Sequence, residues 1–326
     1  MKIIEVNNLV KEFTIKKPFI KENGKRSLFK KEKKIKKAVN NITFSIEEGE
    51  ALAFIGPNGA GKSTTIKMMT GILYPTSGEV KVLGLDPNKD RIKLSHQIGS
   101  VFGQKEQLWV HLSAYENFKF FGSIYDIKKK DLEKRIEELS SLFEIKEFMY
   151  QAVKSLSLGQ RMKCEMVASL LHNPKVLFFD EPTIGLDPIA KEILRKLIKK
   201  INRELGTTII FTSHDVGDIE EVCKRVIIIN DGKIVLDDSM RNLKYHYLNK
   251  KIVEVNLKKD IKIKETEGIK VLKAKDTLYK IEVDMNKTTM EELLSLFKAD
   301  DLQDITISST PLEDIIKDIY RGKNNE

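Results

Sequence analysis

The feature that most constrains the fold is a glycine-rich loop directly after a short apolar run. Residues 51–55 are uniformly apolar, as in a strand buried on both faces of a parallel sheet. The loop and the start of the following helical pattern are Gly56, Pro57, Asn58, Gly59, Ala60, Gly61, Lys62, Ser63 and Thr64. This order matches the loop G-x-x-x-x-G-K-[ST], in which backbone N–H groups surround a phosphate at a helix start.

The loop also predicts two side-chain roles. Lys62 would reach the β- and γ-phosphates of a nucleotide, and the Ser63 hydroxyl would hold Mg²⁺. The loop alone leaves kinase, GTPase and ATPase open.

A second apolar run, Val176–Phe179, ends in two adjacent carboxylates, Asp180 and Glu181. One carboxylate is suited to binding Mg²⁺ through a water molecule, and the other is suited to orienting the attacking water. In isolation such a pair is as often merely a solvated strand end or a helix cap as it is a functional pair. A GTPase would need a guanine-reading N-K-x-D string, and the nearest string, 88–90, has the wrong spacing.

Three further strings complete a fixed order. Leu156–Gln160 precede the carboxylates, Gly185–Asp187 follow them, and His214 comes after the apolar segment 207–212. Together with the loop, this order resembles the nucleotide-binding subunit of ATP-binding cassette (ABC) transporters. The segment 156–187 further resembles the ATPases of ABC-2-type export systems, and the whole resemblance covers about residues 1–238.

The resemblance implies roles for individual residues. Mg²⁺ would be held by Ser63, Asp180 and Gln104. Catalysis would depend on Glu181 as base and on Lys62, Gln104 and His214. The loop residues 56–64 would bind the chain's own ATP, with Phe13 stacked on the adenine. The ATP held by the opposite subunit would be bound by the signature and inter-subunit residues Ser157, Gly159, Gln160 and Asp187. Asp187 also precedes Pro188 and a helix, so it could be an N-cap as well.

The sequence departs from the family pattern at Leu158, at Phe13 and around Gly103, where the Q-loop carries one extra residue. Leu158 stands where the signature usually has its first glycine, which makes that loop bulkier. Phe13 replaces the common tyrosine but keeps an aromatic face. Gln104, rather than Gln107, is assigned to the Q-loop from its spacing to His111.

The resemblance implies ATP and Mg²⁺ as cofactors, a second copy of the chain in an ATP-sandwich homodimer, and separate transmembrane permease subunits. The chain would be cytoplasmic and peripheral on the inner face of the membrane. The alternative is a soluble ABC ATPase acting on ribosomes or nucleic acid. Under the favoured interpretation, as a transporter subunit, we expect no nucleic-acid partner. Trp109, beside the Q-loop, suits either a contact with a membrane subunit or a packed aromatic.

The expected fold is α/β, a P-loop NTPase (ABC ATPase) domain over residues 1–238. A helical subdomain, about residues 111–172, is inserted between strands. For residues 239–326 the sequence predicts a small α+β accessory domain. We favour a dimer-stabilising role for it, and the alternative is a regulatory ligand-binding module. Within it, Thr288 and Glu291 predict a capping box.

Basic residues concentrate in one segment. Residues 16–37 hold 11 Lys/Arg and 2 Asp/Glu, so the net charge of this segment alone equals the +9 of the whole chain. We expect an enlarged hairpin loop there, either merely solvated or in contact with anionic lipid. No apolar run reaches the roughly 20 residues that span a bilayer, and the two cysteines predict no disulfide framework.

Overall fold

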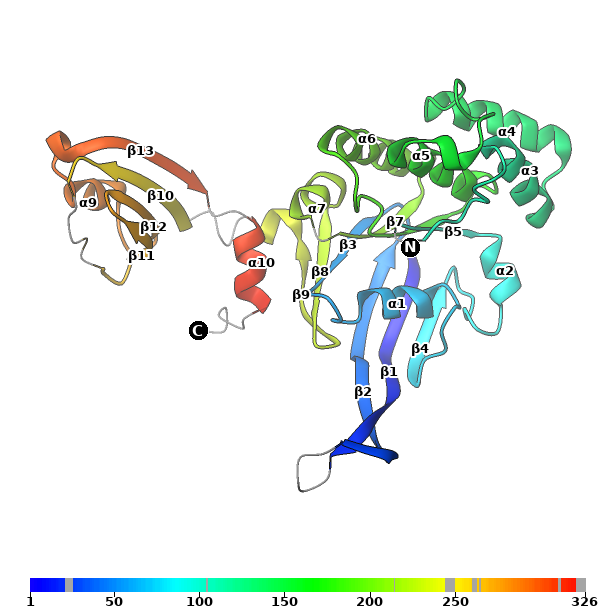
Figure 1. The fold of residues 1–326 in the computed structure, drawn as a ribbon, viewed down its shortest axis with the longest axis horizontal. Coiled ribbons are helices and arrows are strands. Elements are labelled where there is room, and N and C mark those ends of the chain that lie inside the picture. The colour runs from blue at the N-terminus through cyan, green and yellow to red at the C-terminus, as the bar shows by residue number, and fades with distance from the viewer. Residues whose placement is uncertain are drawn as a thin grey trace. The chain divides into compact units, whose positions relative to one another are not determined.

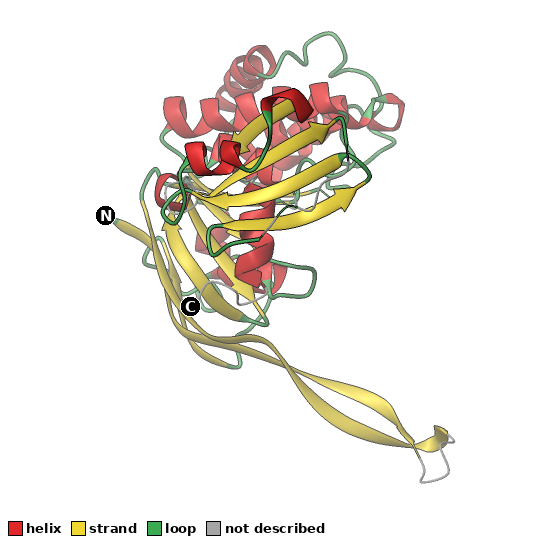
Figure 2. Ribbon diagram, turned by 90° about the vertical axis from the view of Figure 1, so that its left-hand side faces the viewer, coloured by secondary structure: helices red, strands yellow, loops and turns green. Residues whose placement is uncertain are grey.

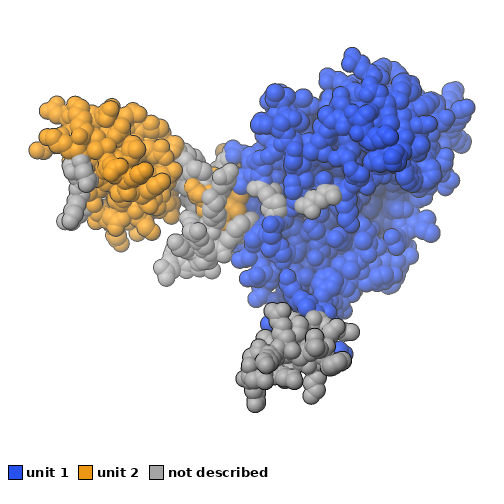
Figure 3. Space-filling model, viewed as in Figure 1, with its two compact units in different colours: residues 1–237 blue, residues 238–326 orange. Residues whose placement is uncertain are grey.

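The computed structural model describes residues 1–20, 26–103, 105–213, 215–243, 250–259, 263, 265–309 and 312–320. They divide into two compact units, residues 1–237 and 238–326 (Figure 3). Gln104 and His214 lie outside the described residues.

The first unit is built on a six-stranded sheet with the strand order β5-β6-β7-β3-β8-β9 (Figure 1). Its strands are β3 (Ala51–Ile55), β5 (Ile98–Phe102), β6 (Val176–Asp180), β7 (Thr208–Thr212), β8 (Arg225–Asn230) and β9 (Lys233–Ser239). The strands from β5 to β8 pair in parallel, and all five residues of β3 are buried. Parallel strands bring the loops after their carboxyl ends to one edge of the sheet.

A second, antiparallel sheet has the order β2-β1-β4. Its strands are β1 (Lys2–Ile20), β2 (Arg26–Glu47) and β4 (Ser77–Val82). The pairing of β1 with β4 reaches only as far as Val10 and Ser77. Beyond that point β1 and β2 continue as a two-stranded ribbon, which Figure 2 shows extending from the sheet.

This ribbon corrects the hairpin loop expected over residues 16–37. Backbone pairs continue through Lys16 with Lys33 and Pro18 with Lys31 to Ile20 with Arg26. A ribbon that is free on both faces does not need the apolar alternation that marks a half-buried strand. The dense charge of the segment therefore conceals its strand character, and residues 21–25 lie outside the described part.

The helices of the first unit are α1 (Lys62–Met69), α2 (Arg91–Ser95), α3 (Ala114–Ile124), α4 (Lys129–Leu142), η1 (Val153–Ser155), α5 (Leu158–Leu170), α6 (Pro188–Leu205) and α7 (Val216–Val222). Figure 1 shows α3, α4 and α5 grouped beside β5. Buried residues of α1, such as Ile66, share one core with both sheets. No helix in the described ranges is both long and apolar enough to traverse a bilayer.

The second unit contains an antiparallel sheet with the order β11-β12-β10-β13. Its elements are β10 (Lys250–Leu257), β11 (Ile269–Lys275), β12 (Leu278–Asp284), α9 (Met290–Ser295), η2 (Ala299–Asp301), β13 (Leu302–Ser309) and α10 (Leu312–Tyr320). The capping box lies one residue later than predicted: Thr289 caps α9 and Glu292 completes the box, whereas Thr288 Oγ1 donates to the Glu292 carboxylate.

Candidate functional site

The loop 56–61 joins the carboxyl end of β3 to the first turn of α1. Gly61, the N-cap of α1, has φ of 113° and makes no side-chain capping hydrogen bond. A Cβ at this position would lie 2.4 Å from the Ala38 carbonyl oxygen, so only glycine fits. No side chain caps the first turn of α1, and the helix presents its positive end to the loop.

The turn between β8 and β9 supports the loop from behind. Asp231 and Gly232 both have positive φ, the combination of a two-residue hairpin turn. The Gly232 N–H donates to the Ala60 carbonyl at 3.0 Å, and the Asn40 N–H donates to the Gly232 carbonyl at 2.8 Å. Backbone hydrogen bonds thus hold the loop in place from neighbouring strands.

Lys62 is folded back over its own loop. Its Nζ donates to the Gly56 carbonyl at 2.6 Å and to the Pro57 carbonyl at 3.2 Å, and the side chain is buried. Burial lowers the pKa of Lys62, and the carboxylates of Glu181 and Asp180 act in the opposite direction. A bound anion would provide the buried ammonium with a stronger partner than the two carbonyls.

Asp180 ends β6 beside the loop. Its Oδ1 accepts hydrogen bonds from Ser63 Oγ at 3.2 Å and from Thr212 Oγ1 at 2.8 Å. A hydroxyl and a carboxylate side by side are the hard oxygen ligands that Mg²⁺ takes when phosphates and waters complete its shell. The donor set of Ser63 and Asp180 therefore fits Mg²⁺.

Glu181 follows immediately and has a left-handed backbone with φ of 56°. Its N–H donates to the Thr212 carbonyl at 3.1 Å. Gly103 lies so close that a Cβ there would be 2.0 Å from the Glu181 carbonyl oxygen. A non-glycine residue in this conformation at a strand end is a strained arrangement of the kind that recurs at functional sites.

Two cavities meet at Glu181. One, of about 200 Å³, is lined by Ser63, Lys67, Ile72, Phe102, Lys105, Asp180 and Glu181. The other, of about 330 Å³, is lined by Phe13, Ile15, Lys36, Ala38, residues 58–64 and Glu181. Phe13 is 39% exposed, and Lys11 Nζ lies 5.3 Å from the centroid of its ring.

The signature residues lie at the start of α5. Ser157 Oγ accepts from the Gln160 N–H at 3.2 Å, and Gln160 Oε1 accepts from the Ser157 N–H at 3.0 Å. A Cβ on Gly159 would lie 3.3 Å from the Ala190 methyl group, so this helix start is close to the start of α6. Residues 157–160 are absent from the linings of the two cavities, within the described part of the chain.

Asp187 caps α6, as its position before Pro188 suggested. Its Oδ1 accepts from the Ala190 N–H at 2.9 Å. Like the signature, Asp187 does not line either cavity of the described chain. The structure thus brings Phe13, residues 58–64, Asp180 and Glu181 together, whereas the signature and Asp187 lie elsewhere on the unit.

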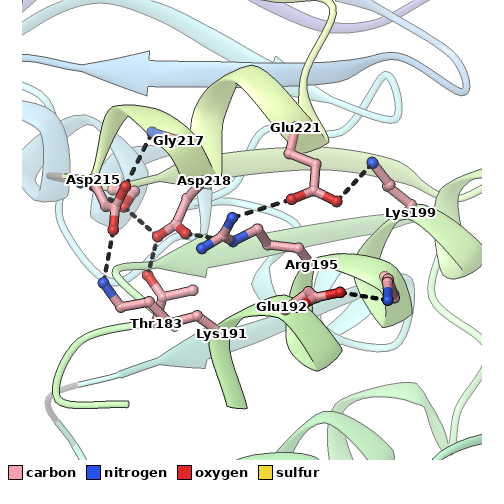
Figure 4. Close-up of polar contacts among 11 residues, drawn as sticks. Thr183, Lys191, Glu192, Arg195, Lys199, Asp215, Gly217, Asp218 and Glu221 are labelled. Atoms are coloured by element: carbon pink, nitrogen blue, oxygen red, sulfur yellow. Dashed lines mark hydrogen bonds and ion pairs between the residues drawn. The ribbon is translucent and has the colours of Figure 1, made fainter. Parts of the chain in front are cut away.

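A buried carboxylate that the motifs did not reveal lies behind the site (Figure 4). Asp218, on α7, has no solvent exposure. It accepts from Thr183 Oγ1 at 2.5 Å and from Ser213 Oγ at 2.9 Å, and it forms an ion pair with Arg195 Nε at 2.8 Å. Thr183 follows the paired carboxylates and Ser213 precedes His214. Asp218 therefore ties two segments of the site together.

A second layer of charges surrounds this group (Figure 4). Arg195 also contacts Glu221, which accepts from Lys199 Nζ at 3.0 Å, and the Lys199 contact lowers the pKa of Glu221. Asp215 caps α7 and forms an ion pair with Lys191 at 2.7 Å. Partial burial raises the pKa of Asp215, but the contact with Lys191 outweighs it and keeps the pKa below its usual value. No sequence pattern identifies this arrangement, because it joins side chains of α6 and α7 that lie far apart along the chain.

Fold and site together define a P-loop NTPase. The family described as "ABC transporter" matches residues 39–184. The chain is 35% identical to the ABC transporter ATP-binding protein NatA of Bacillus subtilis, over 66% of this chain and 87% of NatA. It is 33% identical to the bacitracin transport ATP-binding protein BcrA of Bacillus licheniformis, over 68% of this chain and 70% of BcrA. The chain spans 63% of the length of another relative, YhcH of Bacillus subtilis.

Among solved structures, the dimeric ATP-binding cassette MJ0796 bound to ADP and phosphate has a TM-score of 0.61 and 27% identity. The match covers 73% of this chain and 99% of MJ0796. The chain belongs to the ATP-binding proteins of ABC transporters, a family of ATPases. The expected fold class and family are confirmed, and the relatives do not support the alternative of a ribosome- or nucleic-acid-associated ATPase.

Proposed function

We propose that this chain binds ATP along loop 56–64 and hydrolyses it to ADP and phosphate, and that hydrolysis drives export through separate transmembrane subunits. The observation that carries the proposal is the 3.2 Å contact between Ser63 Oγ and Asp180 Oδ1. These residues are 117 positions apart, and their contact places the helix start that suits phosphate beside the carboxylates that suit Mg²⁺ and water.

Each residue has a distinct part in this hydrolysis. The backbone N–H groups of the loop and Lys62 would bind the phosphates, and Phe13 would stack on the adenine. Glu181 would accept a proton from the attacking water as the new oxygen–phosphorus bond forms and the bond to the ADP oxygen breaks. Ser63, Asp180 and Gln104 would hold Mg²⁺, which neutralises charge on the β- and γ-phosphates when bound.

Asp180→Asn tests this proposal directly. Phosphate release from ATP, measured with the purified chain in Mg²⁺, should fall by at least about 100-fold, since both the metal charge and its ligand set are disturbed. Asp131→Asn, on the exposed surface of α4, is the matched control and should not change the rate. Equal rates for the two variants would contradict the proposal.

We further propose that two copies of the chain enclose two ATP molecules. The signature residues Ser157, Gly159 and Gln160 and the inter-subunit residue Asp187 would serve the ATP of the partner subunit. This arrangement explains why they do not line the cavities of their own chain. The dimeric state of MJ0796 supports the arrangement by similarity.

The proposed contact with the transmembrane subunits lies around Trp109. Trp109 is 48% exposed, and its ring meets Phe120 edge-on with centroids 4.1 Å apart. Exposed aromatic pairs of this kind are common in protein interfaces. Trp109→Ala should reduce co-purification of the integral membrane partner, whereas Ile92→Ala, an exposed apolar residue on α2, should not.

We place the chain on the cytoplasmic face of the membrane, with the basic ribbon 16–37 in contact with anionic headgroups. Each basic residue near such a surface contributes about 1 kcal/mol at most. Replacing Lys30, Lys31 and Lys33 by glutamine should therefore weaken binding to anionic vesicles at low salt by about 10- to 100-fold. The same change at 128–130, on and beside α4, is the control; equal binding of both variants would exclude the lipid contact.

A further inference from the structure

The cavity beside the phosphate-binding loop has an outer wall that the motifs do not predict. Phe13 and Ile15 of β1, together with Lys36 and Ala38 of β2, line it opposite residues 58–64. Of these four wall residues, the family resemblance assigns a role only to Phe13. The base of the basic ribbon therefore forms part of the cavity.

The register of the ribbon explains which side chains face the cavity. Phe13 lies opposite Lys36, and Ile15 lies opposite Lys34. Opposed residues of an antiparallel pair share a face, and residues two apart on a strand share it too. The cavity face therefore presents an apolar column on β1 next to a basic column on β2, whereas Lys33 belongs to the other face.

The charges around the cavity favour an anionic occupant near Lys36. Its neighbour Lys37, on the other face, is paired with Glu12 at 3.3 Å. Among the described residues, no ion pair involves Lys36, which is exposed at the cavity wall. The Lys62 ammonium already donates to a loop carbonyl. Lys36 adds a second positive charge to this cavity, which the Glu181 carboxylate also lines.

We propose that Lys36 is a nucleotide-binding residue that attracts the phosphates of a bound nucleoside triphosphate, and that Ile15 extends the apolar surface that Phe13 offers to the base. The inference rests on the proposed function, since it takes this cavity as the ATP site. It assigns Lys36, at the inner end of the ribbon, to nucleotide binding.

Isothermal titration of the full chain with the non-hydrolysable analogue AMP-PNP and Mg²⁺ tests the assignment. Lys36→Gln should raise the Kd about fivefold, the size expected for a partly solvated charge near a polyanion. Lys36→Arg should stay within about twofold of the wild type because the charge remains. Lys34→Gln, farther from the loop, should have a smaller effect of about twofold.

The matched control is Lys33→Gln, which removes the same charge from the opposite face of the same ribbon. It should leave the Kd unchanged, and raising the salt from about 0.05 M to about 0.5 M should shrink the Lys36→Gln effect. Equal Kd values for Lys36→Gln and Lys33→Gln, or a loss that salt does not change, would overturn the assignment. If the wild type bound no AMP-PNP, the proposed function itself would fail instead.

Discussion

Two helix starts in the first unit are proposed to serve phosphate groups, yet they differ in how their N–H groups are used. At α1 the N-cap is Gly61, and no side chain caps the helix. At α5 the N-cap is Ser157, and a complete capping box with Gln160 occupies both the Ser157 and the Gln160 N–H groups. One helix start is open in the single chain and the other is closed by its own side chains.

This difference indicates an order of events. Nucleotide can enter at α1 without displacing any side-chain cap of the helix. The Ser157 hydroxyl and the Gln160 side chain of α5 would have to exchange their internal hydrogen bonds for bonds to the partner's ATP. Such an exchange costs little because each internal bond contributes only about 1 kcal/mol net. We therefore expect binding at α1 first and engagement of α5 only upon dimer closure.

Glu181→Gln should have the largest effect and should trap the state in which both helix starts are engaged. Loss of a positioned base slows hydrolysis by about 10² to 10⁴-fold, whereas binding at α1 does not use this carboxylate. Phosphate release should collapse while ATP produces a stable dimer in size-exclusion chromatography. Turnover at the normal rate would refute the role of Glu181 as base.

Lys62→Ala tests the open helix start. Charge-assisted hydrogen bonds to phosphate would be lost, so the affinity for ATP should fall by about 10 to 100-fold. Equilibrium dialysis with labelled ATP measures the change. Lys93→Ala, an exposed lysine on α2, is the control and should bind as the wild type does; unchanged binding by Lys62→Ala would show that α1 is not the entry site.

The first of these two regions could be predicted from the sequence more fully than the second. Loop 56–64 follows an apolar run and precedes a helical pattern, so its conformation is encoded within a dozen neighbouring residues. The side-chain capping at α5 depends on rotamers of Ser157 and Gln160, and periodicity does not reveal them. The Ser157-x-x-Gln160 spacing is that of a capping box, but only the structure shows that both of its hydrogen bonds form and close this helix start.

Other differences have similar physical origins. The ribbon over 16–37 was expected to be a loop because paired strands with two solvated faces lack an apolar period. Thr288 and Thr289 offer nearly equal capping patterns, and only the helix start selects Thr289. Asp218 receives hydrogen bonds from Thr183 and Ser213, a convergence that depends on how the segments after β6 and β7 meet α7.

Glu165 provides a pH-dependent test of the α5 region. This buried residue of α5 accepts from the Gln107 N–H at 3.5 Å, and burial raises its pKa from 4.5 to about 7. The folded chain thus retains a proton that the unfolded chain releases above pH 4.5. The free energy of unfolding should fall as pH rises from 4.5 to about 7, by up to about 3 kcal/mol, and level off above.

Glu165→Gln removes this titration while keeping a carbonyl acceptor for Gln107. Its stability gain over the wild type, from urea unfolding, should be small at pH 5 and should grow to a plateau near pH 8. The helix start at Ser157 and the open start at α1 are unchanged by this substitution. A gain that did not vary with pH would show that Glu165 does not titrate in this range.

Ser157→Ala should have the smallest effect and separates the two uses of the α5 start. Loss of the cap should lower the free energy of unfolding by about 1 kcal/mol. Ser113→Ala, which removes the equivalent cap from α3, should cost a similar amount. If Ser157 also serves the partner's ATP, only Ser157→Ala should reduce ATP-dependent dimer formation, while the affinity of the single chain for ATP stays the same for both. Equal dimerisation by the two variants would mean that the closed helix start at α5 is only a helix cap.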